Sequence, residues 1–290
     1  DLVGRAPLKP FADVNEMVSK LSRLFHRMST DLGEKFDMLV EMDTLDLDTR
    51  KGKAPGGYQY YLQKSRVPFI FMNAAGLQGD LETMIHEAGH AFHSIYCGHL
   101  ELIGERSYPI EFAEVASMSM ELMTQKEWGE FYNDEEANRA RLGHLEGVIF
   151  LLPWIATIDS FQHWIYSNPG HTRDERKAVW NSIRDRFGSN MEWGDYQGHR
   201  DTSWQQQGHL FGVPFYYVEY GIAQLGALQL WRTQRNDPAK ALSDYSNAMT
   251  LGNTKTLPEL FSAADIELGF GEKHLDSLIS EVRMAMAELS

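Results

Sequence analysis

The strongest chemical signal in the sequence is an H-E-x-x-H motif, H-E-A-G-H, at residues 86–90. On a helix, His86 and His90 are four residues apart and project from one face, so both imidazoles can reach one Zn²⁺ ion. Glu87 lies about 100° further around the helix axis, where it suits a base that takes a proton from a zinc-activated water. Apolar residues at helical spacing surround the motif from 81 to 92. The motif therefore predicts a zinc site on a helix.

A catalytic zinc needs a third protein ligand and one open position. The metzincin pattern requires Gly at position 93 and His at 96, but the chain has His93 and Tyr96 there. The other source is a following helix, which offers Glu111, Glu114 and Glu121. Glu114 has the most apolar neighbours, and a charge buried among them needs a cation. We expect Glu114 to be the ligand. Glu111 and Glu121 are alternatively surface acids, and Glu121 is also placed to accept a hydrogen bond from a ligand histidine.

Helical periodicity dominates the elements that must position these residues. Helices are expected at 11–32, 80–96 with Asp80 as the N-cap, 109–129, 134–167, 172–187, 214–234, 237–249, 256–264 and 273–288. Pro153 is expected to kink the helix at 134–167. Residues 188–212 have no clear periodicity, and long irregular stretches of this kind are often functional.

A small sheet or ribbon is expected at about 36–75, ahead of the motif helix. The runs with β-like composition are 36–40, 58–61 and 67–72, and a loop rich in Gly and Lys lies at 51–57. The fold class is therefore mainly α, with this small β element. The chain is expected to form one domain over 1–290, with the zinc-bearing helices at about 80–125.

Composition narrows the partners and the compartment. The chain has 27 Lys and Arg against 41 Asp and Glu, a net charge of −14, which argues against nucleic acid and anionic membranes as partners. The longest apolar run, 147–158, is about half the length that a bilayer needs, so no membrane span is expected. A single cysteine, Cys97, excludes an internal disulfide and favours the cytoplasm.

Two blocks of the sequence resemble the thimet oligopeptidase and oligoendopeptidase F family. The first is H-E-A-G-H-A-F-H from His86, with Glu114 in F-A-E-V-A-S 24 positions after His90. The second, H-L-F-G-V-P-F-Y-Y-V-E-Y at 209–220, resembles the segment that closes the active site in these enzymes. It is nearest to the oligoendopeptidase F and Pz-peptidase branch. The resemblance runs from about Lys51 to the C-terminus and implies the zincin-like catalytic half of such an enzyme.

The resemblance implies an endopeptidase that cleaves internal bonds of short peptides through a zinc-activated water. By the same resemblance, His86, His90 and Glu114 are expected to hold one Zn²⁺, and Glu87 is expected to be the general base. The Gly-rich loop, with Gly56 and Gly57, is implied to contact substrate. The 67–72 strand is expected to pair edge-on with a peptide.

The segment 208–221 is implied to close over the substrate. By the same resemblance, His209 and the tyrosines are expected to contact substrate and stabilise the oxyanion, but whether Tyr216, Tyr217 or Tyr220 donates stays open. Helical spacing places Tyr217 and Tyr220 on one face, and Tyr216 four residues before Tyr220. A neighbouring buried stripe is expected from Phe215, Val218, Ile222 and Leu225.

Two rival functions follow from the same motif. A zinc aminopeptidase, or another H-E-x-x-H hydrolase, needs an acidic anchor for the substrate's amino group, and no motif for one is evident. A non-catalytic zinc-binding protein has no use for Glu87, since a structural site is closed by four ligands. Members of the resembled family have a second, N-terminal helical half. The chain is therefore expected to be either a piece that lacks this half or a short form with a more open cleft. In the first case, the missing N-terminal half is its expected partner.

Overall fold

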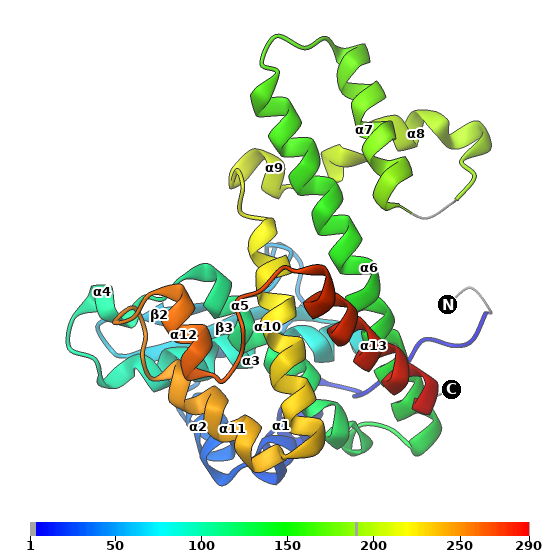
Figure 1. The fold of residues 1–290 in the computed structure, drawn as a ribbon. Coiled ribbons are helices and arrows are strands. Elements are labelled where there is room, and N and C mark those ends of the chain that lie inside the picture. The colour runs from blue at the N-terminus through cyan, green and yellow to red at the C-terminus, as the bar shows by residue number, and fades with distance from the viewer. Residues whose placement is uncertain (1–3, 189–190, 290) are drawn as a thin grey trace. The chain divides into compact units, whose positions relative to one another are not determined.

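The computed structural model describes residues 4–188 and 191–289 (Figure 1). It is mainly α-helical with one small three-stranded sheet, as the sequence predicts. The chain divides into two compact units, one of Asp1–His144 with Ala223–Ser290 and one of Leu145–Ile222. That both belong to a single catalytic domain stays a prediction.

The order of elements follows the predicted alternation of helices around a small sheet. The first unit contains α1 (Val14–Met28), α2 (Thr30–Glu41), β1 (Leu45–Asp48), β2 (Tyr58–Leu62), β3 (Val67–Ala74), α3 (Gln78–Tyr96), η1 (Cys97–His99), α4 (Ile103–Arg106), α5 (Ile110–Thr124), η2 (Gln125–Glu130), α11 (Pro238–Met249), α12 (Leu257–Ala263) and α13 (Glu272–Leu289). The second unit contains α7 (Arg173–Phe187), η3 (Gly194–Tyr196), α8 (Gln197–Thr202), η4 (Ser203–Gln206) and α9 (His209–Gly212). Helices α6 (Asp134–Ser167) and α10 (Val218–Asn236) run through both units.

The N-terminal helical segment is two helices rather than one. Ser29 has extended backbone, so α1 ends at Met28 and α2 begins at Thr30. The run at 36–40, expected to be a strand, lies inside α2. Its composition is β-like, but Leu32, Phe36 and Leu39 are spaced for one helical face, and all three are buried. Packing of that face against the core stabilises the helical conformation of 36–40. The β element therefore begins at Leu45 and not at 36.

The sheet has the order β1-β3-β2, with β3 in the middle. Strand β3 is parallel to β1 and antiparallel to β2, with Gln59 opposite Ile70. The prediction that 67–72 pairs edge-on with a peptide is therefore wrong, because both edges of β3 are already paired. The free edges of this sheet belong to β1 and β2.

Other boundaries also differ from the sequence predictions. Helix α3 begins at Gln78, and Asp80 lies inside its first turn, where its carboxylate accepts the backbone N–H groups of Ala75 and Leu77 at 2.8 and 2.9 Å. Helix α5 ends at Thr124 and tightens into η2. The stretch at 188–212 consists largely of short helical turns, apart from 189–190, which lie outside the described residues.

Helix α6 has the predicted bounds and is continuous through Pro153. It has 34 residues and is, by length and composition only, long and apolar enough to cross a membrane. The core helix of a soluble protein meets the same criteria, so this helix is weak evidence for a membrane. The expectation of no membrane span, which rested on the shorter run at 147–158, stays a prediction.

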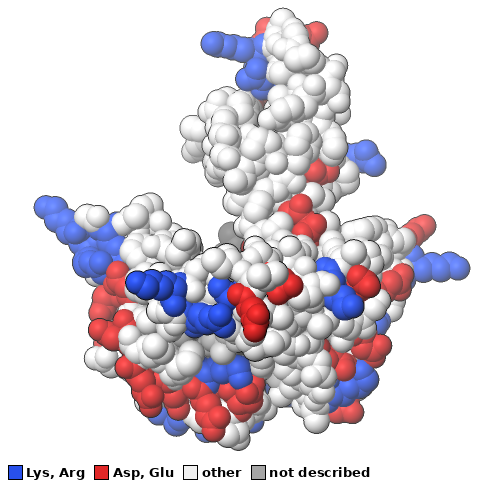
Figure 2. Space-filling view, turned by 90° about the vertical axis from the view of Figure 1, so that its left-hand side faces the viewer, with Lys and Arg blue, Asp and Glu red and all other residues white. Residues whose placement is uncertain are grey.

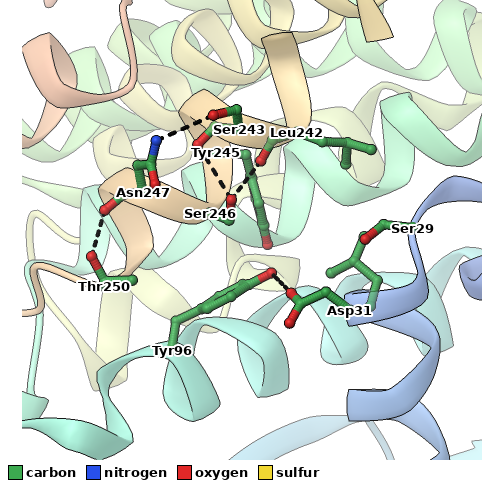
Figure 3. Close-up of a pocket in the computed structure, with 10 residues that line it drawn as sticks. Ser29, Asp31, Tyr96, Leu242, Ser243, Tyr245, Ser246, Asn247 and Thr250 are labelled. Atoms are coloured by element: carbon green, nitrogen blue, oxygen red, sulfur yellow. Dashed lines mark hydrogen bonds between the residues drawn. The ribbon is translucent and has the colours of Figure 1, made fainter. Parts of the chain in front are cut away.

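A cavity of about 400 Å³ lies between the start of α2, the end of α3 and α11 (Figure 3). Its lining groups bond to one another: the Tyr96 hydroxyl donates to Asp31 at 2.5 Å, and the Asn247 amide donates to Ser243 at 3.2 Å (Figure 3). Tyr96 lies six residues beyond His90, or about 9 Å along α3. The cavity therefore joins α2, α3 and α11 away from the predicted zinc residues.

Gly89, inside the H-E-x-x-H motif, lies close against the backbone of α5. A Cβ atom at this position would lie 2.6 Å from Cα of Ser117 and 2.9 Å from the carbonyl oxygen of Ala116. Both neighbours are backbone atoms of α5 and cannot move aside alone. The absence of a side chain at Gly89 therefore sets how near Glu114 on α5 comes to the two histidines on α3.

Replacing Gly89 with Ala is expected to lower the free energy of unfolding by about 1–3 kcal/mol, because the added methyl group overpacks the α3–α5 contact. Urea unfolding followed by circular dichroism measures this change. Gly79→Ala is the matched control on the same helix, since open space surrounds its Cβ position, and it should cause no loss. Equal stabilities of the two variants would contradict the proposed contact.

Candidate metal centre

Three side chains from two helices bring their donor atoms together. The Nε2 atoms of His86 and His90 lie 3.1 Å apart, and Oε2 of Glu114 lies 3.3 Å from the first and 3.6 Å from the second. Two ligands bound to a tetrahedral zinc at its usual bond lengths are about 3.3 Å apart. The observed separations bracket that value, so these residues fit a zinc ion with one position left open.

The charges at this site also favour a cation. Glu114 is only 4% exposed, and its carboxylate accepts a hydrogen bond from Ser117 at 3.1 Å. Burial acts to raise the pKa of Glu114, but the hydrogen bond to His86 and the charge of His90 outweigh it and lower the pKa. Two imidazole nitrogens that face each other need a proton or a metal ion between them. Within the described residues, this is the group of three that could hold a metal ion.

Glu87 is buried beside the donor group on α3. Burial raises the pKa of its carboxyl to about 7, although the charge of His86 and a hydrogen bond from the backbone N–H of Gln59 act in the opposite direction. Gln59 belongs to β2, an edge strand. A carboxyl with a pKa near neutrality can accept a proton and return it. The site therefore combines three metal donors with an adjacent acid–base group.

Glu121 accepts a hydrogen bond from Nδ1 of His86 at 2.6 Å, so the alternative of a surface acid is wrong for this residue. Its other oxygen accepts from Nε2 of His144 at 2.9 Å. Burial opposes ionisation, but His144 and His86 hold the pKa of Glu121 down at about 2. The sequence analysis missed His144, because it lies on α6 and no spacing rule connects it to α5. Glu111 lies in the first turn of α5, outside the donor group.

In the second unit, His209 lies among the three predicted tyrosines. Its ring centroid is 4.9 Å from Tyr217, 5.7 Å from Tyr220 and 5.8 Å from Tyr216. The Tyr220 hydroxyl and Nε2 of His209 are 3.5 Å apart, and Gln207 contacts Nδ1 at 2.6 Å. The structure thus assembles these predicted residues into one cluster of hydrogen-bond donors, within a different unit from the metal donors.

The predicted buried stripe beside this cluster holds only at its last position, because Phe215 is exposed and Val218 and Ile222 are only partly buried. Helix α10 begins at Val218, and Phe215 precedes it with a φ of 62° and 37% of its surface exposed. Its ring contacts His163 and Tyr166, at centroid distances of 5.1 and 5.0 Å. Leu225 is buried, as expected. The left-handed backbone at Phe215 stops the helical spacing from extending back through residue 215.

Residues 20–278 of the chain match peptidase family M3. The chain belongs to this family.

Individual relatives within M3 agree with this assignment. Oligopeptidase PepF of Bacillus subtilis (strain 168) is 28% identical over 82% of the chain, and the chromosomal oligoendopeptidase F of Lactococcus lactis subsp. cremoris is 25% identical over 56%. The structure of Pz peptidase A with an inhibitor superposes on 97% of the chain with a TM-score of 0.90 and 31% identity. The matched parts cover 36%, 25% and 50% of these relatives, so this M3 chain spans about half their length or less.

The Gly-rich loop of this M3 chain is packed in place on the sheet. Gly56 has a φ of 97°, and a Cβ atom on Gly57 would lie 3.0 Å from the side chain of Thr83. The Asn73 amide holds the loop by donating to the carbonyl oxygens of Ala54 and Gly56, at 2.8 and 3.1 Å. Contact of Gly56 and Gly57 with substrate stays a prediction.

Two other reactive side chains near the motif are structural. His93 is buried and stacks on Tyr108, with ring centroids 3.5 Å apart, and burial lowers its pKa well below the usual value. Cys97 is buried at the end of α3, and burial raises the pKa of its thiol to about 12. The thiol also donates to the backbone carbonyl oxygen of Met249 at 3.1 Å, as fits a small core residue.

Proposed function

We propose that this M3 chain is the catalytic part of a zinc-dependent oligopeptidase that hydrolyses internal bonds of short peptides. The observation that carries this proposal is the group of the half-buried His86 and His90 with the buried Glu114, at zinc spacing, with Glu87 beside it. When bound there, one zinc ion supplies Lewis-acid activation of water and of the scissile carbonyl. Membership of family M3 and the names of the relatives support the same reaction class.

Glu87 is the proposed general base. Its carboxylate accepts the proton of the attacking water and then delivers that proton to the leaving amine. The backbone N–H of Gln59 on β2 lies near this carboxylate and acts to lower its pKa. Because β2 is an edge strand, an extended peptide that adds to its free edge lies next to Glu87. This edge replaces the β3 edge expected from the sequence.

His209 and the tyrosine cluster are the proposed donors to the oxyanion. Replacing Tyr220 with Phe is expected to lower kcat about a hundredfold with little change in KM, because the hydroxyl stabilises the transition state rather than the substrate. Tyr220 is favoured over Tyr216 and Tyr217 because its hydroxyl faces Nε2 of His209. Steady-state cleavage of an internally quenched peptide measures the effect.

The matched control for Tyr220→Phe is Tyr166→Phe, an exposed tyrosine of the same unit. It should leave kcat unchanged. A native kcat in the Tyr220 variant, with a hundredfold loss in the Tyr216 or Tyr217 variant, would reassign the donor. Native rates in all three would remove the tyrosine cluster from the mechanism.

The substrate pattern separates the endopeptidase from a zinc aminopeptidase. The 290-residue chain should cleave an internally quenched peptide with a blocked amino terminus, and should release nothing from a single amino-acid amide. Cleavage of the amide alone would establish the aminopeptidase instead. A non-catalytic zinc protein is disfavoured because the donor group among the described residues has three members, whereas a structural site has four.

The surface suggests which peptides and which compartment to test first. The net charge is −14, and acidic side chains gather along the lower part of the face in Figure 2, with smaller basic groups among them. This balance favours basic or neutral peptides over acidic ones.

We propose the cytoplasm as the compartment of this activity, on the basis of the single cysteine. The relatives also contain a segment that this chain does not match, and we propose a segment of that kind as a further partner of this chain.

A further inference from the structure

His144 on α6 lies at the far end of a hydrogen-bonded series that starts at the metal donors. His86 donates from Nδ1 to one oxygen of Glu121 at 2.6 Å, and His144 donates from Nε2 to the other oxygen at 2.9 Å. The Gln125 amide contacts Nδ1 of His144 at 2.7 Å. Three elements, α3, α5 and α6, are thus connected through one carboxylate.

The surroundings of His144 fix its ring. Its side chain is 9% exposed and packs against the buried ring of Trp128, with centroids 5.6 Å apart. With the Gln125 amide donating to Nδ1, the proton of a neutral ring is on Nε2, facing Glu121. Arg141 donates to the backbone carbonyl oxygen of Gln125 at 2.8 Å, which ties the end of α5 to α6. The His144 ring is therefore bonded at both nitrogens and packed on one face, so its Nε2–H group keeps a constant direction toward Glu121.

We propose that His144 is a positioning residue of the metal centre, which holds Glu121 in the orientation that directs Nε2 of His86 at the metal. Without His144, one oxygen of Glu121 loses its partner, and the carboxylate is free to rotate away from Nδ1 of His86. His86 then samples other ring orientations and tautomers, which weakens its bond to a metal ion. His144 touches neither the metal donors nor the substrate edge, so its effect passes through Glu121.

The inference rests on the proposed zinc site and predicts a change in zinc affinity. The zinc dissociation constant of the full 290-residue chain, measured by competition with a chromophoric chelator, should rise about tenfold in His144→Ala. His144→Gln, which keeps an N–H donor, should recover most of the affinity. His163→Ala is the control, because His163 is an exposed histidine on the same helix, and it should bind zinc as the native chain does.

A double-mutant cycle separates positioning through Glu121 from general loss of packing. Glu121→Gln alone should weaken zinc binding, and adding His144→Ala should weaken it no further, because the two residues act in series. Thermal unfolding of each zinc-free variant shows whether it is folded before zinc is added. Native affinity in His144→Ala, or effects of the two substitutions that multiply, would overturn the role of His144. Absence of zinc binding by the native chain would instead overturn the proposed zinc site itself.

Discussion

Replacing Glu87 with Gln is expected to lower kcat/KM for peptide cleavage by about 10²–10⁴-fold while zinc stays bound. Gln has nearly the same shape as Glu but cannot accept the proton of the attacking water. The three metal donors are not changed, so zinc content should remain at one ion per chain. Cleavage of an internally quenched peptide and elemental analysis of the same sample provide both measurements.

Glu111→Gln is the matched control for this substitution. Glu111 is on α5, in its first turn and outside the donor group, so the same chemical change should leave cleavage at the native rate. Retained cleavage by Glu87→Gln with zinc bound would rule out Glu87 as the general base. Loss of zinc from Glu87→Gln would contradict the placement of Glu87 beside the metal rather than on it.

Replacing Glu114 with Gln is expected to raise the zinc dissociation constant by more than about 100-fold, the upper range for residues that only support a ligand. Glu114 is the anionic donor of the group and is buried, so no solvent-exposed acid can take its place. Zinc at 100 times its dissociation constant should stabilise the native chain by about 2.7 kcal/mol. At the same zinc concentration, the variant should gain almost none of this stabilisation.

Thermal unfolding with and without zinc measures this difference. Without zinc the variant should remain folded, because a neutral amide of the same size occupies the site and its oxygen can still accept the hydrogen bond from Ser117. Equal zinc-dependent stabilisation of the native chain and the Glu114 variant would exclude Glu114 as a ligand. Glu111→Gln again serves as the control with native zinc affinity expected.

The local part of the metal centre is predictable from sequence because it lies within one helix and its neighbour. The spacing of His86 and His90 fixes their common face, and the apolar neighbours of Glu114 indicate a buried charge that needs a partner. His144 is not predictable in this way. Its hydrogen bond to Glu121 joins side chains of two different helices, α6 and α5, and no local sequence pattern encodes that contact.

Helix bounds were predictable where periodicity is long and uninterrupted, as in α6, whose predicted limits match the structure. The predicted bounds were wrong in short segments whose composition favours a strand while their apolar spacing favours a helix. The run at 36–40 has β-like residues, but the burial of Phe36 and Leu39 on one face makes it helical. The order of strands was also beyond the sequence, because pairing of β3 on both edges depends on contacts between distant segments. Grouping of His209 with the tyrosines rested on the family resemblance.

The most direct test of the account is a zinc titration of the metal-free 290-residue chain, with cleavage of an internally quenched peptide followed at each step. Cleavage should be absent without zinc, rise in proportion to added zinc and saturate at one ion per chain. Mass spectrometry of the products should show an internal bond cut. Cleavage that persists in excess chelator, or stoichiometric zinc binding without any cleavage, would contradict a zinc-dependent endopeptidase built on His86, His90, Glu114 and Glu87.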